Sequence, residues 1–251
     1  MAGTALTSHA TYPPLNTLKP IADDVWIVDG PVIRFGAPLV KMPFPTRMTI
    51  VRVENDALFV HSPTPLPDAL KAEIDALGTP RWIVGPNRIH YWWIPDWRSA
   101  YPNAAIYLAR RIREQAAGRI DFPTHDLSGA SGYPWDAAIA TMPMPGSFMT
   151  EFEFFHRASR TLILTDLIEN FEPDKLGRAA RWLAWFGGAL DPDGQTPRDM
   201  RLTYTRNKAD LRIAVETMIA WKPERVVLTH GRWYERAAEQ ELRRALRWLL
   251  D

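Results

Sequence analysis

Residues 81–90 read RWIVGPNRIH, an apolar run followed directly by turn-forming residues and then a histidine. Residues 81–84 are typical of a buried strand, which the Gly-Pro-Asn sequence ends. Residues 57–60 form another apolar run, and residues 67–78 between the two runs carry apolar side chains at helical spacing. A strand, a helix and a strand in this order predict a right-handed crossover between parallel strands. The sequence therefore predicts an α/β fold in which His90 follows a strand end.

The rest of the chain extends this pattern in both directions. Residues 48–53 and 57–60 predict a hairpin, whereas residues 30–45 carry four prolines and predict a loop or an edge strand. Further on we expect strands at 139–144, 149–156, 161–165 and 225–229, and helices at 174–190, 208–221 and 235–250. Strands on both sides of the only candidate boundary, near residue 145, favour a single domain over residues 21–251, preceded by a surface segment over residues 1–20.

Composition excludes several classes of function. The net charge is +1, from 30 Lys+Arg against 29 Asp+Glu, so we expect neither nucleic acid nor a membrane as partner. The chain has no cysteine, which excludes disulfides, zinc ribbons, iron–sulfur clusters and a cysteine nucleophile. The N-terminus lacks a secretory pattern, and no apolar run reaches the roughly 18–20 residues that span a bilayer. These features favour a cytoplasmic protein.

Three polar residues occupy equivalent places in the predicted fold. His90 follows the strand at 81–84, Asp166 ends the strand at 161–165, and His230 ends the strand at 225–229. Ligands of layered α/β folds bind where loops leave the strand ends. Two imidazoles and a carboxylate there could hold one divalent cation with an open position for water. The alternative is a buried His–Asp–His cluster that satisfies its own hydrogen bonds without metal.

The order of these elements resembles that of the metallo-β-lactamase-like hydrolase superfamily over nearly the whole chain. The resemblance implies a four-layer αββα sandwich, an α+β arrangement with a metal site at one edge between two sheets. Three parts of the sequence also resemble, more narrowly, a family of that fold with a domain of unknown function. These parts are residues 85–90 (GPNRIH), residues 154–162 (FFHRASRTL) and Asp166.

The sequence departs from the superfamily's metal motif, which is a His-x-His-x-Asp-His run. With the last histidine aligned on His90, the other three ligand positions hold Gly85, Asn87 and Ile89. Ser147 stands where the superfamily has its next histidine, just after a Pro-Gly turn. The resemblance therefore implies at most one metal ion (Zn, Fe or Mn) on His90, Asp166 and His230, with Asp166 as the catalytic residue that orients the attacking water.

Other residues are candidates for binding a substrate. His61 lies at a strand end beside Ser62, and Asn87 shares a loop with His90. The remaining candidates are His156, Trp93 and Trp233. Each has a structural alternative: a turn cap for His156, loop hydrogen bonds for Asn87 and core packing for the tryptophans. The apolar cluster at 182–186 predicts either core packing, which we favour for Trp182 and Trp185, or a homodimer surface.

Two functions follow from these residues. The first is a metal-dependent hydrolase in which a single metal activates water against an ester, amide or phosphoester. The second is a non-catalytic protein that kept the fold, lost its metal sites and binds a small-molecule ligand. Three convergent ligands with an open position favour catalysis, whereas Trp92 and Trp93 filling the metal space would favour binding.

Overall fold

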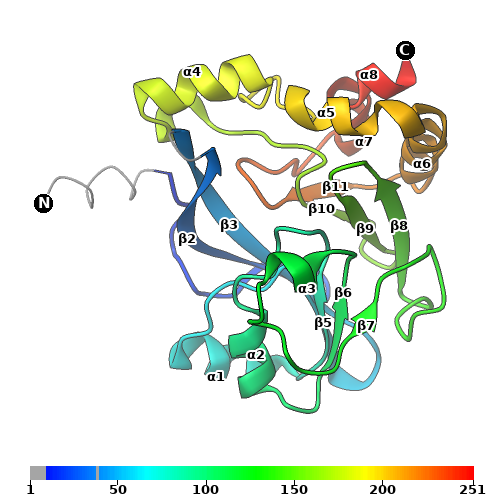
Figure 1. Ribbon diagram of the computed structural model, residues 1–251. Coiled ribbons are helices and arrows are strands. Elements are labelled where there is room, and N and C mark those ends of the chain that lie inside the picture. The colour runs from blue at the N-terminus through cyan, green and yellow to red at the C-terminus, as the bar shows by residue number, and fades with distance from the viewer. Residues whose placement is uncertain (1–9, 38–39) are drawn as a thin grey trace, which may run out of the picture.

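The computed structural model describes residues 10–37 and 40–251, which form two β-sheets packed face to face with helices outside (Figure 1). The first sheet has the strand order β1-β2-β3-β4-β5-β6-β7, and the second has the order β11-β10-β9-β8. The strands of the first sheet are β1 (Lys19–Ala22), β2 (Val25–Ala37), β3 (Val40–Arg52), β4 (Ala57–His61), β5 (Thr79–Gly85), β6 (Ala105–Leu108) and β7 (His125–Asp126). Those of the second are β8 (Ile139–Pro145), β9 (Thr150–His156), β10 (Thr161–Leu164) and β11 (Arg225–Leu228).

The helices divide between the outer faces of the two sheets. Against the first sheet pack α1 (Asp68–Leu77), α2 (Ile94–Ala100) and α3 (Ile112–Gln115), and against the second pack α6 (Lys208–Ala220), α7 (Ala238–Ala245) and α8 (Arg247–Leu250). Near the tip of β2 and β3 lies α4 (Arg178–Gly187), and α5 (Arg198–Tyr204) lies between α4 and α6 (Figure 1). Short 3₁₀ helices occur at Glu54–Asp56, Pro173–Lys175 and Thr205–Asn207. This arrangement is the predicted αββα sandwich.

Side chains of the second sheet point alternately to its two faces, and each face contributes to a separate hydrophobic core. Phe152 and Phe154 of β9 point between the sheets, whereas Phe155 packs under the outer helices. Burying side chains of this size contributes about 1.5–3 kcal/mol each. The predicted crossover is confirmed, because β4 pairs in parallel with β5 through α1, and β5 pairs in parallel with β6. These parallel strands bring the loop with His90 to one edge of the sandwich.

Of the two alternatives predicted for residues 30–45, a loop or an edge strand, the structure shows an edge strand over residues 30–37 and 40–45. β2 and β3 continue as an antiparallel pair in which Val32 faces Pro45 and Ile33 faces Phe44. We call residues 30–37 and 40–46 the arm. On the N-terminal side of Thr49, β3 pairs only with β2, since β4 ends at His61 opposite Thr49. Prolines are tolerated on such a free edge because they remove no ladder hydrogen bond.

Two predictions differ from the structure. Trp182 and Trp185, for which core packing was favoured, are 63% and 55% exposed on α4. The predicted helix at 174–190 is shorter, and only its Ala184 side is buried. Of the predicted surface segment, residues 1–9 lie outside the described residues, whereas Ala10 and Thr11 are buried. Lys175 Nζ donates to Thr11 O, so residues 10 and 11 pack against the second half of the chain.

Among the helices of the described residues, none has both the length and the apolar character that crossing a bilayer requires.

Candidate metal centre

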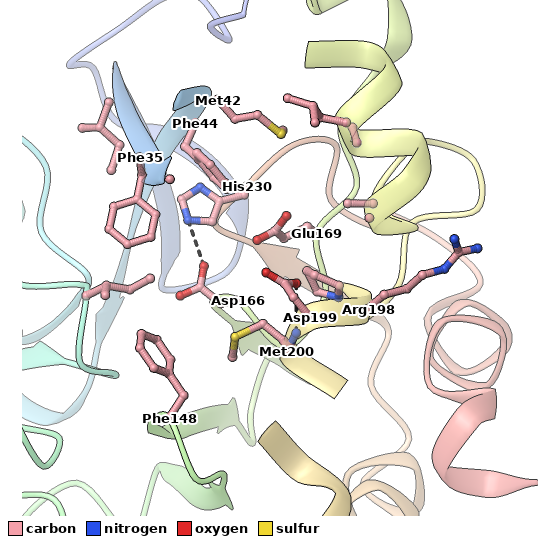
Figure 2. A pocket seen from close by; sticks show the side chains of 18 of the residues that line it. Phe35, Met42, Phe44, Phe148, Asp166, Glu169, Arg198, Asp199, Met200 and His230 are labelled. Atoms are coloured by element: carbon pink, nitrogen blue, oxygen red, sulfur yellow. Dashed lines mark hydrogen bonds and ion pairs between the residues drawn. The ribbon is translucent and has the colours of Figure 1, made fainter. Parts of the chain in front are cut away.

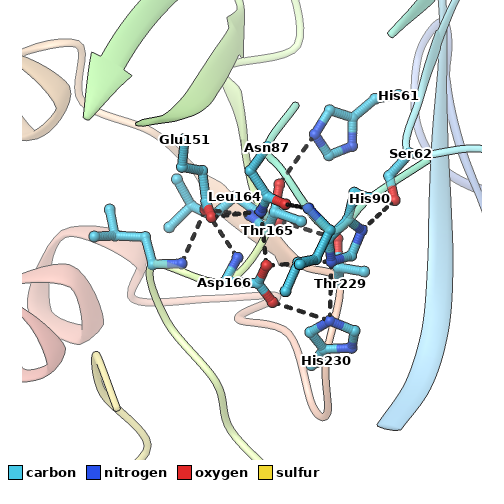
Figure 3. A network of polar contacts seen from close by, with 12 residues as sticks. His61, Ser62, Asn87, His90, Glu151, Leu164, Thr165, Asp166, Thr229 and His230 are labelled. Atoms are coloured by element: carbon cyan, nitrogen blue, oxygen red, sulfur yellow. Dashed lines mark hydrogen bonds and ion pairs between the residues drawn. The ribbon is translucent and has the colours of Figure 1, made fainter. Parts of the chain in front are cut away.

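His90, Asp166 and His230 meet at the edge between the two sheets (Figure 3). Their side chains come from the loops after β5, β10 and β11, as the sequence predicted. His90 Nε2 lies 3.2 Å from Asp166 Oδ2, and His230 Nε2 lies 3.1 Å from Asp166 Oδ1. The two Nε2 atoms are 3.2 Å apart. Within residues 10–37 and 40–251, this is the one group of three or more metal-ligating side chains whose ligand atoms lie so close together.

The far side of each imidazole is already engaged. His230 Nδ1 lies 2.7 Å from Pro45 O, a carbonyl that can only accept, so Nδ1 carries the hydrogen. In the neutral ring, Nε2 then presents its lone pair to Asp166. His90 Nδ1 lies 2.7 Å from Ser62 Oγ, which holds this ring in place. A lone pair facing a carboxylate requires a positive charge between them, either a second proton on an imidazole or a metal ion.

The donor set passes a simple geometric test for a metal. A tetrahedral ion with bonds of about 2.0–2.1 Å keeps its ligand atoms about 3.3–3.4 Å apart. The observed separations of 3.1–3.2 Å are within a few tenths of an ångström of this. Two neutral imidazoles and one carboxylate suit Zn²⁺, Fe²⁺ or Mn²⁺. The hydrogen bonds on the outer nitrogens are those that typically orient metal-binding histidines.

Asp166 is held by a buried polar network. Asn87 Nδ2 donates to Asp166 Oδ2 over 2.6 Å and lies 2.8 Å from Glu151 Oε2. Burial alone would raise the pKa of Asp166, but His90 and His230 outweigh it and hold that pKa below its ordinary value. Asp166 is therefore an anion pointing at the two imidazoles. Asn87 is fully buried, and its Oδ1 accepts from the Ile89 N–H over 3.0 Å, so the predicted loop-structuring alternative holds while its Nδ2 fixes Asp166.

Glu151 is a site residue that the sequence analysis missed. Its Oε1 accepts from the backbone N–H groups of residues 165, 166 and 167, which fixes the turn that carries Asp166. Burial, followed by the charge of Asp166, raises the pKa of Glu151. The TEFEFF pattern of residues 150–155 is typical of a strand with one face in water. The outer helices cover that face, so Glu151 and Glu153 are both buried.

Ser62 positions His90 from behind. It adopts φ +52°, an uncommon conformation for a residue other than glycine, and this directs its hydroxyl to His90 Nδ1. Ser62 is not among the residues that line the cavity described below. A nucleophilic role has no support in this arrangement, because the imidazole lies between the hydroxyl and the cavity.

His61 is fully buried beneath the site. Its Nε2 lies 3.3 Å from Thr165 Oγ1, and its ring packs edge-on against Phe154 at 5.5 Å. Burial, aided by nearby His90, lowers the pKa of His61 from 6.5 to about 3. It therefore stays neutral at physiological pH and supports the floor of the site without reaching a substrate.

His61 is expected to make the fold acid-sensitive. In the unfolded chain, His61 takes up a proton below pH 6.5, whereas in the folded chain it does so only near pH 3. The free energy of unfolding therefore decreases as the pH falls from 6.5 to 3. The loss at pH 4.5 is about 2–3 kcal/mol. Urea denaturation at pH 7 and pH 4.5 measures it, and His61→Gln should abolish this part of the loss. His125→Gln, at an exposed histidine, should behave as the parent; equal acid sensitivity of the two variants would contradict the assignment.

Three other predicted residues are not brought to the cavity. Trp93 packs against the core at the start of α2, and its neighbour Trp92 lines the cavity in its place. Trp233 packs beside the outer helices and lines a separate polar hollow. His156 lies at the opposite end of β9 from Glu151, with Nδ1 2.8 Å from Ser159 Oγ. The turn-cap alternative thus describes His156.

The positions that lack the superfamily's ligands have other roles here. A Cβ at Gly85 would lie 2.8 Å from Ile112 Cδ1 and 3.1 Å from His90 O, so even alanine is crowded there. Ile89 forms part of the cavity wall, and Ser147 is exposed, with its N–H bonded to Thr203 O. Since Asn87 is committed to Asp166 and Glu151, the group that could hold an ion here, within the described part of the chain, is His90, Asp166 and His230.

A cavity of about 670 Å³ opens above the three ligands. Its floor contains His90, Asp166, His230 and Glu169, and its walls come from the arm, α4, α5 and the turn at 148–149 (Figure 2). Burial raises the pKa of Glu169 well above its usual range, and the nearby Asp166 carboxylate adds to this. The volume is typical of small-molecule sites. Neither Trp92 nor Trp93 blocks the ligand atoms, because all three ligands line the open cavity.

Gly231 is expected to be irreplaceable beside His230. It has φ +94°, and a Cβ there would lie 2.1 Å from Asn170 O. Gly231→Ala should therefore cost about 2–4 kcal/mol of folding free energy from backbone strain and the clash. Gly187→Ala is the matched control, since nothing lies within 4 Å of its added methyl group. Chemical denaturation compares the two, and equal stabilities would show that the His230 turn adapts freely.

Comparison with known proteins agrees with this fold. The structure is similar to those of the DIM-1 metallo-β-lactamase exposed to ceftazidime (TM-score 0.60, 12% identity, 92% of this chain and 96% of the other) and the metallo-β-lactamase from Pontibacter korlensis (0.58, 11%, 93% and 98%). It is also similar to the FIM-1 metallo-β-lactamase from Pseudomonas aeruginosa in its mono-zinc form (0.56, 14%, 93% and 94%). Identities this low show the fold alone, and the expected metallo-β-lactamase-like fold is confirmed.

Sequence comparison gives the family. A search of curated protein sequences finds no significant match. The model of one family, described as "Domain of unknown function (DUF4336)", matches residues 23–176, which is more than half of the chain. The chain therefore belongs to this family of metallo-β-lactamase-like fold, DUF4336.

Proposed function

We propose that the protein is a hydrolase that works with one divalent metal ion held by His90, Asp166 and His230. The observation that carries the proposal is the convergence of two imidazole Nε2 atoms and a carboxylate at the floor of an open cavity. Both imidazoles have their other nitrogen hydrogen-bonded, His230 to Pro45 O and His90 to Ser62 Oγ, so both Nε2 atoms are turned toward Asp166. A FIM-1 metallo-β-lactamase of the same fold was crystallised in a mono-zinc form, which supports a one-metal arrangement.

A bound divalent metal would supply a nucleophilic water at neutral pH and polarise the bond to be cleaved. Asp166 holds one oxygen toward each histidine, and Asn87 fixes its orientation, so its carboxylate can accept a hydrogen bond from the attacking water. Glu169 is the other carboxyl group at the floor and, with its raised pKa, carries a proton available to a leaving group. The substrates in question are esters, amides and phosphoesters.

Metal content tests the proposal directly. Protein prepared without chelator or affinity-tag metal is expected to hold about one equivalent of Zn, Fe or Mn, measured by mass spectrometry. The His90→Ala/His230→Ala variant should hold none while keeping its circular dichroism spectrum. His156→Ala is the matched control, because His156 is equally buried but lies away from the cavity.

A panel of nitrophenyl esters, anilides and phosphoesters then tests hydrolysis. The loaded parent should cleave one class, lose the activity with EDTA and regain it with the metal. A parent that takes up no metal from excess Zn²⁺ or Mn²⁺ would end the hydrolase proposal. The open cavity would then be assigned to the alternative, a non-catalytic binding protein.

A further inference from the structure

The cavity above the three ligands has walls almost without polar side chains. The arm contributes Phe35, Met42 and Phe44, and these face α4 across the opening (Figure 2). From α4 come Leu183 and Phe186. Phe44 lies edge-on to His230, with ring centroids 5.1 Å apart, so the apolar wall begins directly at the ligands. A small polar substrate would leave these side chains in contact with water.

The apolar surface continues outside the cavity. Phe186 lines the opening and is 62% exposed, and its ring lies 5.1 Å from that of Trp185. Trp185 in turn lies 5.7 Å from Trp182. Residues three and four positions apart on a helix are neighbours, so Trp182, Trp185 and Phe186 form one exposed aromatic strip. Contiguous apolar surface of this kind marks a binding site more often than it occurs by chance.

Polar groups gather around the three ligands, at one end of this path. The floor holds the two histidines, Asp166 and Glu169, and Asp199 of α5 lies near enough to add to the raised pKa of Glu169. A ligand that matches this distribution has a polar group at one end and a long apolar chain. Each methylene group that leaves water for such walls tightens binding by about fourfold.

We propose that the cavity binds the alkyl or acyl chain of an amphiphilic substrate, with the chain running from the three ligands between the arm and α4. The placing of the substrate's polar, hydrolysable group at His90, Asp166 and His230 rests on the proposed function. The binding of the chain does not, because it needs only the apolar walls.

Displacement of an uncharged fluorescent probe tests chain binding without metal. EDTA-treated protein is mixed with N-phenyl-1-naphthylamine, and 1-alkanols from hexanol to dodecanol compete for the cavity. Affinity is expected to rise about threefold to fourfold per methylene. Affinity that does not rise with chain length would overturn the proposal.

Variants on the two walls locate the chain. Phe35→Ser on β2 and Phe186→Ser on α4 should each weaken dodecanol binding about tenfold, since each removes an aromatic ring that the bound chain would cover. Ile213→Ser is the matched control, because Ile213 is 62% exposed on α6 and does not line the cavity. An effect of Phe186→Ser with none of Phe35→Ser would place the probe on the outer face of α4 and overturn the proposal.

These outcomes are separable from those of the proposed function. Chain binding measured in EDTA does not depend on metal, and metal content does not depend on the alkanols. If both hold, nitrophenyl esters should show kcat/KM values that rise with acyl length in the metal-loaded parent, and this rise should be lost in Phe35→Ser.

Discussion

Replacing Asp166 by asparagine is expected to weaken zinc binding by at least about a hundredfold while the protein keeps its fold. Loss of a partner that merely orients a ligand already costs about 10–100-fold in metal affinity, and Asp166 is the only anion among the three ligands. Asparagine has the same size, and its oxygen can still accept from Asn87. Its amide group can donate to the Nε2 lone pair of His230, so the network remains hydrogen-bonded without metal.

The measurement is a competition titration of EDTA-treated protein with a zinc-sensitive dye. Asp199→Asn is the matched control: it removes a carboxylate that lines the same cavity but lies outside the ligand group, and it should bind zinc within about threefold of the parent. Parent-like affinity in Asp166→Asn would mean that the metal is held elsewhere. The circular dichroism spectrum shows whether any loss arises from unfolding.

Removing the side chain of Arg47 is expected to destabilise the fold by about 3–5 kcal/mol. Arg47 is 2% exposed and pairs with Asp29, with its Nη2 2.8 Å from Asp29 Oδ1. Its Nη1 donates to Leu228 O and Gly231 O, over 2.5 and 2.9 Å. These carbonyls flank His230, so this one guanidinium ties the first sheet to the loop that carries His230. Arg47→Ala leaves a buried carboxylate and two carbonyls short of donors.

Urea denaturation of Arg47→Ala and Arg52→Ala gives a matched comparison on one strand. Arg52 pairs with Asp24 near the surface, with 35% and 44% of the two side chains exposed, so its loss should cost less than about 1 kcal/mol. Arg47→Lys should lie between the parent and Arg47→Ala, because an ammonium group cannot reproduce the planar fork. Equal losses for the two alanine variants would show that Arg47 does not anchor the His230 loop. Zinc affinity should fall together with stability only for the Arg47 variants.

Local sequence patterns were enough to predict the strands and the helix that position His90, Asp166 and His230. The helix at 68–77, the parallel strands on either side of it and the strand ends before His90, Asp166 and His230 all follow from apolar spacing and turn residues. The end of a strand can be predicted from the sequence, because the apolar side-chain pattern stops there. Asp166 and His230 then lie side by side because β10 and β11 are parallel neighbours, whereas His90 comes from the other sheet.

The residues that hydrogen-bond to His90, Asp166 and His230 could not be predicted from such local patterns. Pro45 falls in the stretch predicted as a loop or an edge strand, but nothing in that pattern indicates that its carbonyl on the free edge of β3 sets the tautomer of His230, 185 positions away in the sequence. Glu151 looked solvent-facing but is buried, because whether water reaches a strand face depends on helices that pack there later in the chain. Trp93 and its neighbour Trp92 differ only in direction, which the start of α2 determines.

The sequence by itself determined the two-sheet architecture, the absence of cysteine chemistry and the strand-end positions of His90, Asp166 and His230, since these depend on composition and on periodicity within short segments. Only the tertiary structure decided that the ligand atoms converge, that His61 and Asn87 are buried and do not face the cavity, and that apolar walls rise from the arm and α4. Those properties depend on distances between residues far apart in the chain, and no local pattern encodes such distances.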